Sequence, residues 1–285
     1  MKLAMIIPSV RFYQLRLILN HVISLKPPPD IVVLIVPDKF IRKLNNVIQK
    51  LDNVDVKFII LTQQRGLVEA RNKGIVAAIN HGADLIWLFE DDTLVLNKNI
   101  INIIKVYYLK YTKEKNRRIG IIFGYQELKP VDYIERPLQY LNTELTRNSS
   151  TRLISLLHNI FLNIHGFNGL PYLIPVATLV LTKESIQASG LFYEGFKKEA
   201  EWSEPDLINR ILNNGLIAIR LKNFIVRHYI SSTKYKSIGF WLRRLHNFLL
   251  YLVRNRRYCI SCFLFAMLLT LGAYIIILRQ IKFRK

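Results

Sequence analysis

Short apolar runs and amphipathic segments alternate along the first 125 residues of the chain. The runs are apolar at almost every position, which is typical of strands covered on both faces of a sheet. The segments between them repeat apolar residues at helical spacing, and helices of this length join parallel strands. We therefore expect an α/β domain in which a mostly parallel sheet carries helices on both faces. The expected strands cover residues 3–10, 31–36, 56–61, 84–89 and 120–125, and the expected helices cover residues 12–25, 40–51, 66–82 and 99–111.

The pattern continues less regularly to about residue 230, where this domain is expected to end. Further strands are expected at 171–182 and 216–230, with a helix at 201–215 between them. The stretch 153–167 is amphipathic and fits either a core helix or a helix that faces a membrane.

Acidic residues follow two of the expected strands. Glu90, Asp91 and Asp92 end the fourth strand, and Asp38 comes shortly after the second. Ligands of parallel sheets bind beyond the carboxyl ends of the strands. Adjacent carboxylates repel one another, so a cation or a ligand that brings one would stabilise them there. The alternative for the triplet is an exposed turn or a helix cap.

The net charge of +21 is concentrated in the C-terminal part of the chain. The first 206 residues hold 26 basic and 20 acidic side chains, whereas the last 79 residues hold 15 basic side chains and no acidic one. Residues 258–278 form a run of 21 residues without a charge, with arginines and lysines on both sides. Such a run is long enough to cross a bilayer core of about 30 Å. We expect a transmembrane helix there and a basic tail at 279–285; the alternative is a buried helix of a soluble core.

The segment 231–257 precedes this run and is expected to lie at the membrane surface. Its part 238–253 is amphipathic, basic and contains Trp241, a composition typical of interfacial helices. These basic residues border an apolar helix and do not form a groove interleaved with aromatic side chains. Phospholipid is therefore the expected partner, and no nucleic acid is expected, although a basic nucleic-acid-binding protein is an alternative.

The N-terminus and the cysteines add two expectations. The first apolar run is short and is interrupted by Pro8, unlike a signal peptide. Cys259 and Cys262 both lie in the apolar run, so neither a disulfide framework nor a metal cluster is implied.

Two stretches carry a resemblance to a known family. "TQQRGLVEARNKGIVAAINHGADLIWLFEDD" and "SEPDLINRILNNG" resemble motifs of the family 2 glycosyltransferases, and the likeness extends from residue 2 to about residue 257. "YLVRNRRY", at 251–258, is similar to a Tyr-x-x-Arg-Asn signature of rhamnosyltransferase-like members. The resemblance implies a GT-A fold and an inverting transfer of a sugar from a nucleotide diphosphate sugar to a hydroxyl group.

The resemblance also implies roles for the acidic motif. Asp92 matches a ligand of a divalent metal ion, Mg²⁺ or Mn²⁺, and Asp91 matches a residue that binds the ribose or the metal. Glu90 stands where relatives usually have Asp, and its role stays open. Arg71 would reach the diphosphate or the acidic motif. His228 follows a strand where many relatives have a metal-ligating His, but a lone His is also common at the surface or in a core.

The remaining roles implied by the resemblance concern the nucleotide and the acceptor. Pro8 and Ser9 end the first strand where relatives touch the nucleotide, and Asp38 aligns with an acid that contacts the base or the ribose. Glu204 stands at the position of the general base, and Asp206 could compete for that role. The acceptor would be a lipid-linked or membrane-proximal glycan.

Two other classes of protein remain as alternatives. A sugar nucleotidyltransferase of the same fold needs a glycine-rich loop after its first strand, and "PSVRFYQL" has no glycine. A membrane-anchored protein that binds nucleotide sugars without catalysis is favoured only by the glutamates that replace aspartates. We expect a single-pass or monotopic membrane protein. Basic residues flank both ends of the run 258–278, so the positive-inside rule does not predict its orientation in the membrane. A cytoplasmic catalytic domain is expected because sugar nucleotides are usually made in the cytoplasm.

Truncation after Arg257 tests the anchor directly. Removing the apolar run should release much of the protein from membranes, while the basic amphipathic stretch should retain weak binding to anionic lipid that salt abolishes. Flotation with anionic vesicles at low and high salt measures both effects. A full-length protein that is soluble without detergent would contradict the prediction.

Overall fold

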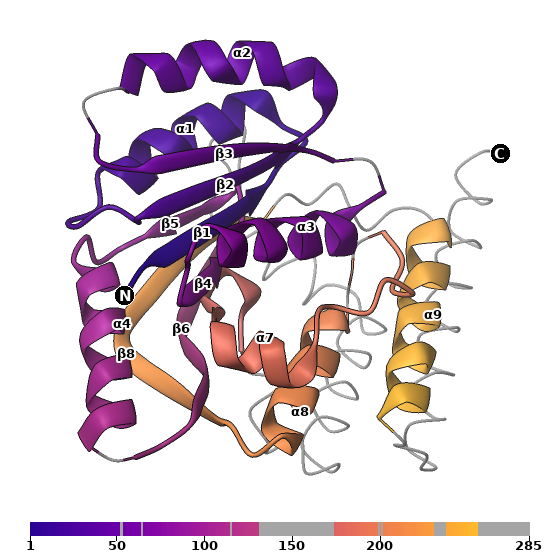
Figure 1. Cartoon of the computed structure of the whole chain (residues 1–285). Coiled ribbons are helices and arrows are strands. Elements are labelled where there is room, and N and C mark those ends of the chain that lie inside the picture. Colours follow the sequence, from indigo (N-terminus) through magenta and orange to yellow (C-terminus); the bar gives the residue numbers. More distant parts are fainter. Residues whose placement is uncertain are drawn as a thin grey trace, which may run out of the picture.

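The computed structural model describes residues 1–51, 54–63, 65–114, 116–130, 174–198, 200, 202–230 and 238–255 (Figure 1). The amphipathic stretch 153–167 and the expected transmembrane segment 258–278 lie outside these residues. Among the helices that are described, none is both long enough and apolar enough to span a bilayer.

A single sheet of eight strands forms the centre of the described structure, in the order β3-β2-β1-β4-β7-β6-β8-β5. The four strands β3, β2, β1 and β4 are parallel to one another, as the continuous apolar runs predict. The strands are β1 (Leu3–Pro8), β2 (Ile31–Val36), β3 (Lys57–Thr62), β4 (Leu85–Leu88), β5 (Thr93–Val95), β6 (Ile119–Pro130), β7 (Val180–Thr182) and β8 (Ile217–Ile230).

The other half of the sheet is mixed, and here the sequence prediction needs correction. β7 runs antiparallel to both β4 and β6, and β5 runs antiparallel to β8, while β6 and β8 are parallel. Of the expected strand 171–182, the structure describes residues 174–182, which hold the 3₁₀ turn η4 (Val176–Thr178) and the short strand β7. β5 was not predicted, because three residues are too few to show a strand period.

Helices cover both faces of the sheet, as predicted, and two apolar cores result. One core joins the sheet to α1, α2 and α4, and the other joins it to α3, α7, α8 and α9. The helices are α1 (Phe12–Ile23), α2 (Asp38–Ile48) with η1 (Gln49–Leu51), α3 (Leu67–Asn80), α4 (Ile100–Leu109) with the π turn η2 (Lys110–Glu114), α7 (Lys183–Ser189), α8 (Ser203–Asn213) and α9 (Ile238–Arg254).

The packing of α3 on β1 and β2 determines where one charged side chain of the site lies. A Cβ atom at Gly74 would overlap the side chain of Ile6 and crowd Ile35, so glycine permits this close approach. One turn earlier, Arg71 is thereby held against the carboxyl edge of the sheet, where it is buried.

Candidate active site

Three potential metal ligands converge after β4. Glu90, Asp92 and His228 each place one ligand atom within 4.8 Å of the others. The antiparallel pairing of β5 with β8 sets Thr93 opposite His228, and the amide of Tyr229 donates to the carbonyl of Asp92 at 2.8 Å. His228 Nε2 lies 3.1 Å from Asp92 Oδ1 and 3.8 Å from Glu90 Oε2. The two carboxylates suit Mg²⁺ or Mn²⁺, whereas an imidazole ligand is more common with transition metals.

The ring of His228 is fixed by a neighbour on the adjacent strand. The side chain of Gln126, on β6, is hydrogen-bonded to Nδ1 of His228. This contact directs Nε2 toward the two carboxylates, as outer partners of metal-binding histidines commonly do. The structure therefore places Nε2 of His228 beside Asp92 and Glu90, and metal binding by His228 stays a prediction.

Arg11, in the short loop between β1 and α1, contacts the acidic motif, and sequence reasoning missed it. Its guanidinium is paired with Asp91 and lies 2.8 Å from Asp92 Oδ2, and the hydroxyl of Ser9 donates to Asp91. Burial alone would raise the pKa of Asp92, but hydrogen bonds from His228 and Arg11 lower it to about 2. The only signal in the sequence was the place of Arg11, two residues after Ser9, at the end of a strand next to β4.

The negative charge of Glu90 is offset less by neighbouring cations and donors than that of Asp92. Burial raises its pKa; His228 and Arg71 oppose that effect, and the charges of Asp92 and Glu204 add to it. Its Oε1 lies 3.9 Å from Arg71 Nη2, too far for a hydrogen bond. A cation bound beside Glu90 would therefore stabilise its ionised form.

Arg71 connects this motif to the first turn of α8. Its guanidinium forms an ion pair with Glu204 and lies over the ring of Phe192 at 5.7 Å. Ser203 donates to the other oxygen of Glu204 at 3.2 Å. Arg71 and Glu204 are both buried. Removing one partner of a buried pair typically costs about 3–5 kcal/mol, so each of the two holds the other in place.

Asp206 faces away from the acidic motif. Its carboxylate accepts hydrogen bonds from Arg210 on its own helix and from Arg254 and Asn255 at the end of α9, at 3.0–3.1 Å. Residues two positions apart point about 200° apart around a helix. The same turn therefore directs Glu204 toward the motif and Asp206 toward α9, and Glu204 is the better candidate for a base.

Pro8 and Asp38 lie at the edge of the sheet where the acidic motif lies. Pro8 is half-buried at the end of β1, and Asp38 is exposed at the start of α2, directly beyond β2. The carboxyl ends of β1, β2 and β4 meet at this edge because these strands are parallel. Their contacts with a nucleotide stay predictions.

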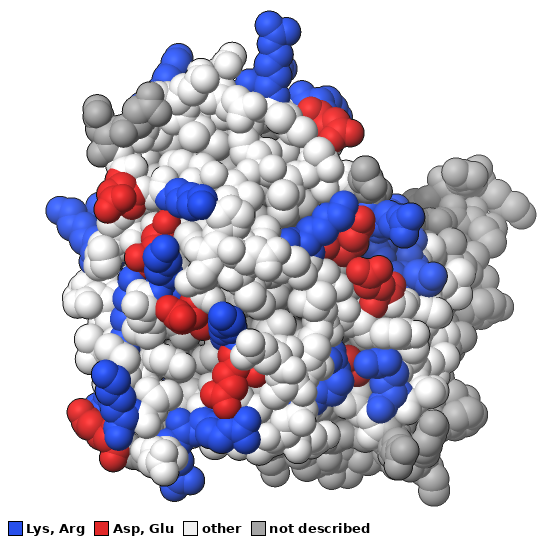
Figure 2. Space-filling model, in the orientation of Figure 1, with Lys and Arg blue, Asp and Glu red and all other residues white. Residues whose placement is uncertain are grey.

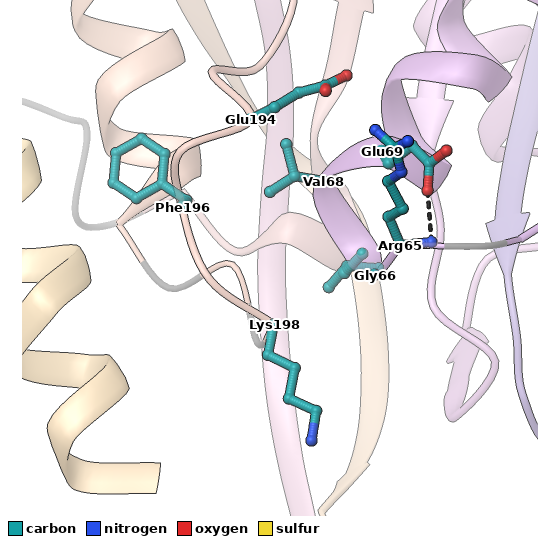
Figure 3. Close-up of a pocket in the computed structure, with 8 residues that line it drawn as sticks. Arg65, Gly66, Val68, Glu69, Glu194, Phe196 and Lys198 are labelled. Carbon is teal, nitrogen blue, oxygen red and sulfur yellow. Dashed lines mark hydrogen bonds between the residues drawn. The ribbon is translucent and has the colours of Figure 1, made fainter. Parts of the chain in front are cut away.

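A pocket of about 170 Å³ opens at the start of α3 (Figure 3). Charged side chains of both signs line it, with Arg65 and Glu69 on the helix side and Glu194 and Lys198 on the facing loop. The carboxylate of Glu69 accepts from the backbone amide of Arg65 at 2.5 Å, and its hydrogen bond with Lys73 lowers its pKa. The surface view shows the same mixture of charges over this face (Figure 2).

Comparison with known proteins identifies the fold. No protein-family profile matches the chain, and none of the curated proteins matches its sequence. Among solved structures, residues 1–349 of Staphylococcus aureus TarS in complex with UDP superpose with a TM-score of 0.51 at 14% identity, over 88% of this chain and 66% of that one.

Two further structures carry metal ions. The mannosyltransferase PcManGT from Pyrobaculum calidifontis, in complex with GDP-Man and Mn²⁺, has a TM-score of 0.57 at 13% identity, over 96% of this chain and 69% of that one. Glucosyl-3-phosphoglycerate synthase from Mycobacterium tuberculosis, with Mn²⁺, UDP and phosphoglyceric acid, has a TM-score of 0.53 at 11% identity, over 89% of this chain and 78% of that one. These similarities confirm the expected GT-A fold.

Substitution of Arg11 by Gln tests the electrostatics of the motif. Arg11 occupies one oxygen of Asp92 and places a positive charge beside the metal ligands. Its removal should tighten Mn²⁺ binding roughly tenfold, equivalent to about 1.4 kcal/mol. Calorimetric titration of the protein with Mn²⁺ measures the change.

Arg16→Gln is the matched control, because Arg16 is exposed on α1, the helix that begins directly after Arg11. It should leave Mn²⁺ affinity unchanged. Weaker Mn²⁺ binding by Arg11→Gln would show that Arg11 organises the carboxylates and does not compete with the ion.

Proposed function

We propose that this protein is an inverting, metal-dependent glycosyltransferase that uses a nucleotide diphosphate sugar as donor. One observation carries the proposal: Arg71 joins a three-residue metal-ligand cluster to the buried carboxylate of Glu204. A leaving-group site and a candidate base thus lie side by side at the carboxyl edge of a GT-A sheet. The solved structures of this fold that contain UDP or GDP-Man with Mn²⁺ support this reading.

Glu90, Asp92 and His228 would hold a Mg²⁺ or Mn²⁺ ion. Such an ion, when bound, supplies a Lewis acid that offsets the charge of a departing diphosphate. Asp91, which Ser9 and Arg11 hold in place, would bind the ribose hydroxyls. The nucleotide would bind at the carboxyl ends of β1 and β2, in contact with Pro8, Ser9 and Asp38.

Arg11 and Arg71 are the arginines placed to offset the negative charge of the donor diphosphate. Each guanidinium is paired with carboxylates of the site in this structure. A guanidinium offers several planar donors and can bond a phosphate oxygen while it keeps a carboxylate partner. Arg71, with its side chain 3% exposed, would act mainly by holding Glu204, whereas Arg11, 32% exposed, is open to a ligand.

Glu204 would act as the general base. It would take the proton of the acceptor hydroxyl as the acceptor oxygen forms a bond to the anomeric carbon and the bond to the nucleoside diphosphate breaks. Attack from the side opposite the leaving group inverts the anomeric centre. Ser203 and Arg71 bond the two oxygens of Glu204 and so keep its side chain from rotating away.

The acceptor is proposed to be a lipid-linked or membrane-proximal glycan, with the catalytic domain on the cytoplasmic side. The sequence features at 231–285 motivate this part of the proposal, and α9 adds a structural one. Its exposed apolar side chains Leu242, Leu249 and Val253 lie along one side of the helix, while Phe248 and Tyr251 are buried on the other. Exposed apolar residues on a basic helix suit a phospholipid surface.

Glu204→Gln tests the assignment of the base. Removing a general base typically lowers the rate about 10²–10⁴-fold, so single-turnover transfer should slow by that factor. Binding of the nucleotide sugar should persist, because glutamine can still accept a hydrogen bond from Arg71. Stopped-flow or quench measurements of transfer, with donor affinity measured in parallel, separate the two effects.

Glu184→Gln serves as the control, because Glu184 is exposed on α7 and pairs only with Arg118 among the contacts described. Its rate should match that of the wild type. Unchanged transfer by Glu204→Gln would rule out this residue as the base.

A further inference from the structure

α9 holds the segment that leads into α8. The rings of Phe248 and Tyr251 pack against Trp202 with centroids 4.7 and 5.4 Å apart. The side-chain amide of Asn247 bonds both the amide and the carbonyl of Lys197, at 2.7 and 3.1 Å. Figure 1 shows α9 at one side of the described structure, beside the loop that leads to α8.

A polar network then joins the end of α9 to the first turns of α8. Arg254 Nε and Asn255 Nδ2 donate to the same oxygen of Asp206, at 3.0 and 3.1 Å. Asn209, one turn further along α8, donates to the hydroxyl of Tyr251 at 2.8 Å and to Asn255 at 3.2 Å. The three conspicuous residues of the Tyr-x-x-Arg-Asn motif therefore all contact α8.

This network fixes the rotation of α8 at the turn that carries Glu204. Glu204 and Asp206 point about 200° apart, so Arg71 holds the turn from one side and α9 holds it from the other. Trp202 begins the helix in the left-handed region, at φ 72°, and the amide of Asp206 closes that turn on the carbonyl of Trp202 at 3.1 Å. A small rotation of this turn would separate Glu204 from the acidic motif.

We propose that Arg254 and Asn255 are positioning residues for the transfer reaction: through Asp206 they set the direction of Glu204. The inference rests on the proposed function and gives the Tyr-x-x-Arg-Asn motif a task inside the catalytic domain. Apolar side chains alone could pack α9 against α8. The side chain of Asp206 is 2% exposed, and its charged, directional bonds to Arg254 fix the rotation of α8 as well as its contact with α9.

A double-mutant cycle between Arg254 and Asp206 tests the inference. Arg254→Gln should lower kcat by roughly 10–100-fold, as small misplacements of catalytic groups do, with little change in the KM for the donor. Asp206→Asn should have a similar effect, and the double variant should be no slower than the worse single variant. Arg254→Lys should recover part of the rate, because a lysine keeps the charge and one bond.

Asn213→Ala is the control, because Asn213 is exposed at the last position of α8, more than two turns from Glu204. Its kcat should equal that of the wild type. Thermal unfolding of each variant shows whether it is folded at the assay temperature, and Asn255→Ala serves if Arg254→Gln does not fold. A folded Arg254→Gln or Asn255→Ala variant with wild-type kcat would overturn the inference, and so would additive losses in the double variant.

The outcome for the wild type separates this inference from the proposed function. A wild-type protein that transfers no sugar from any nucleotide donor contradicts the proposed function itself. If the wild type transfers sugar and the Arg254 and Asp206 variants do so at the same rate, the proposed function holds and only the positioning role of α9 is contradicted.

Discussion

Electrostatic repulsion among carboxylates is the constraint on which this structure depends. Glu90, Asp91 and Asp92 follow one another at the end of β4, and Glu204 adds a further negative charge from α8. Partial burial makes this repulsion costly, so the surrounding elements supply cations and donors: Arg11 from the loop after β1, Arg71 from α3 and His228 from β8. These neighbours stabilise the ionised form of Asp92 strongly but that of Glu90 only weakly. A divalent ion bound beside Glu90 would supply the missing positive charge.

The same contacts link parts of the chain that are distant in sequence. Arg71 joins α3 to α8, and Asp206 joins α8 to the end of α9, so the proposed base is held between two helices of the same core. The segment 231–257, which the sequence assigns to a membrane surface, therefore contains a helix, α9, that also contacts the turn of α8 carrying Glu204. In this account, the metal site, the base and α9 form one connected arrangement at the carboxyl edge of the sheet.

Much of this arrangement could be predicted from local sequence. The parallel half of the sheet follows from continuous apolar runs between helices, and the acids at 90–92 follow from their place at a strand end. The pairing of Arg11 with Asp91 and Asp92 could not be predicted, because it depends on β1 lying next to β4. Likewise, His228 reaches Asp92 only through the short strand β5, and the choice between Glu204 and Asp206 depends on the rotation of α8.

Metal-dependent binding of a nucleotide sugar tests the central claim most directly. Calorimetric titrations of the protein with UDP-sugars and GDP-sugars, in Mn²⁺ and in EDTA, should show saturable binding of at least one donor only when Mn²⁺ is present. Asp92→Asn should abolish that binding while the protein remains folded, because Asp92 is the carboxylate on which Arg11 and His228 converge. Binding that is equally strong in EDTA or in Asp92→Asn, or no binding of any nucleotide sugar, would contradict the account.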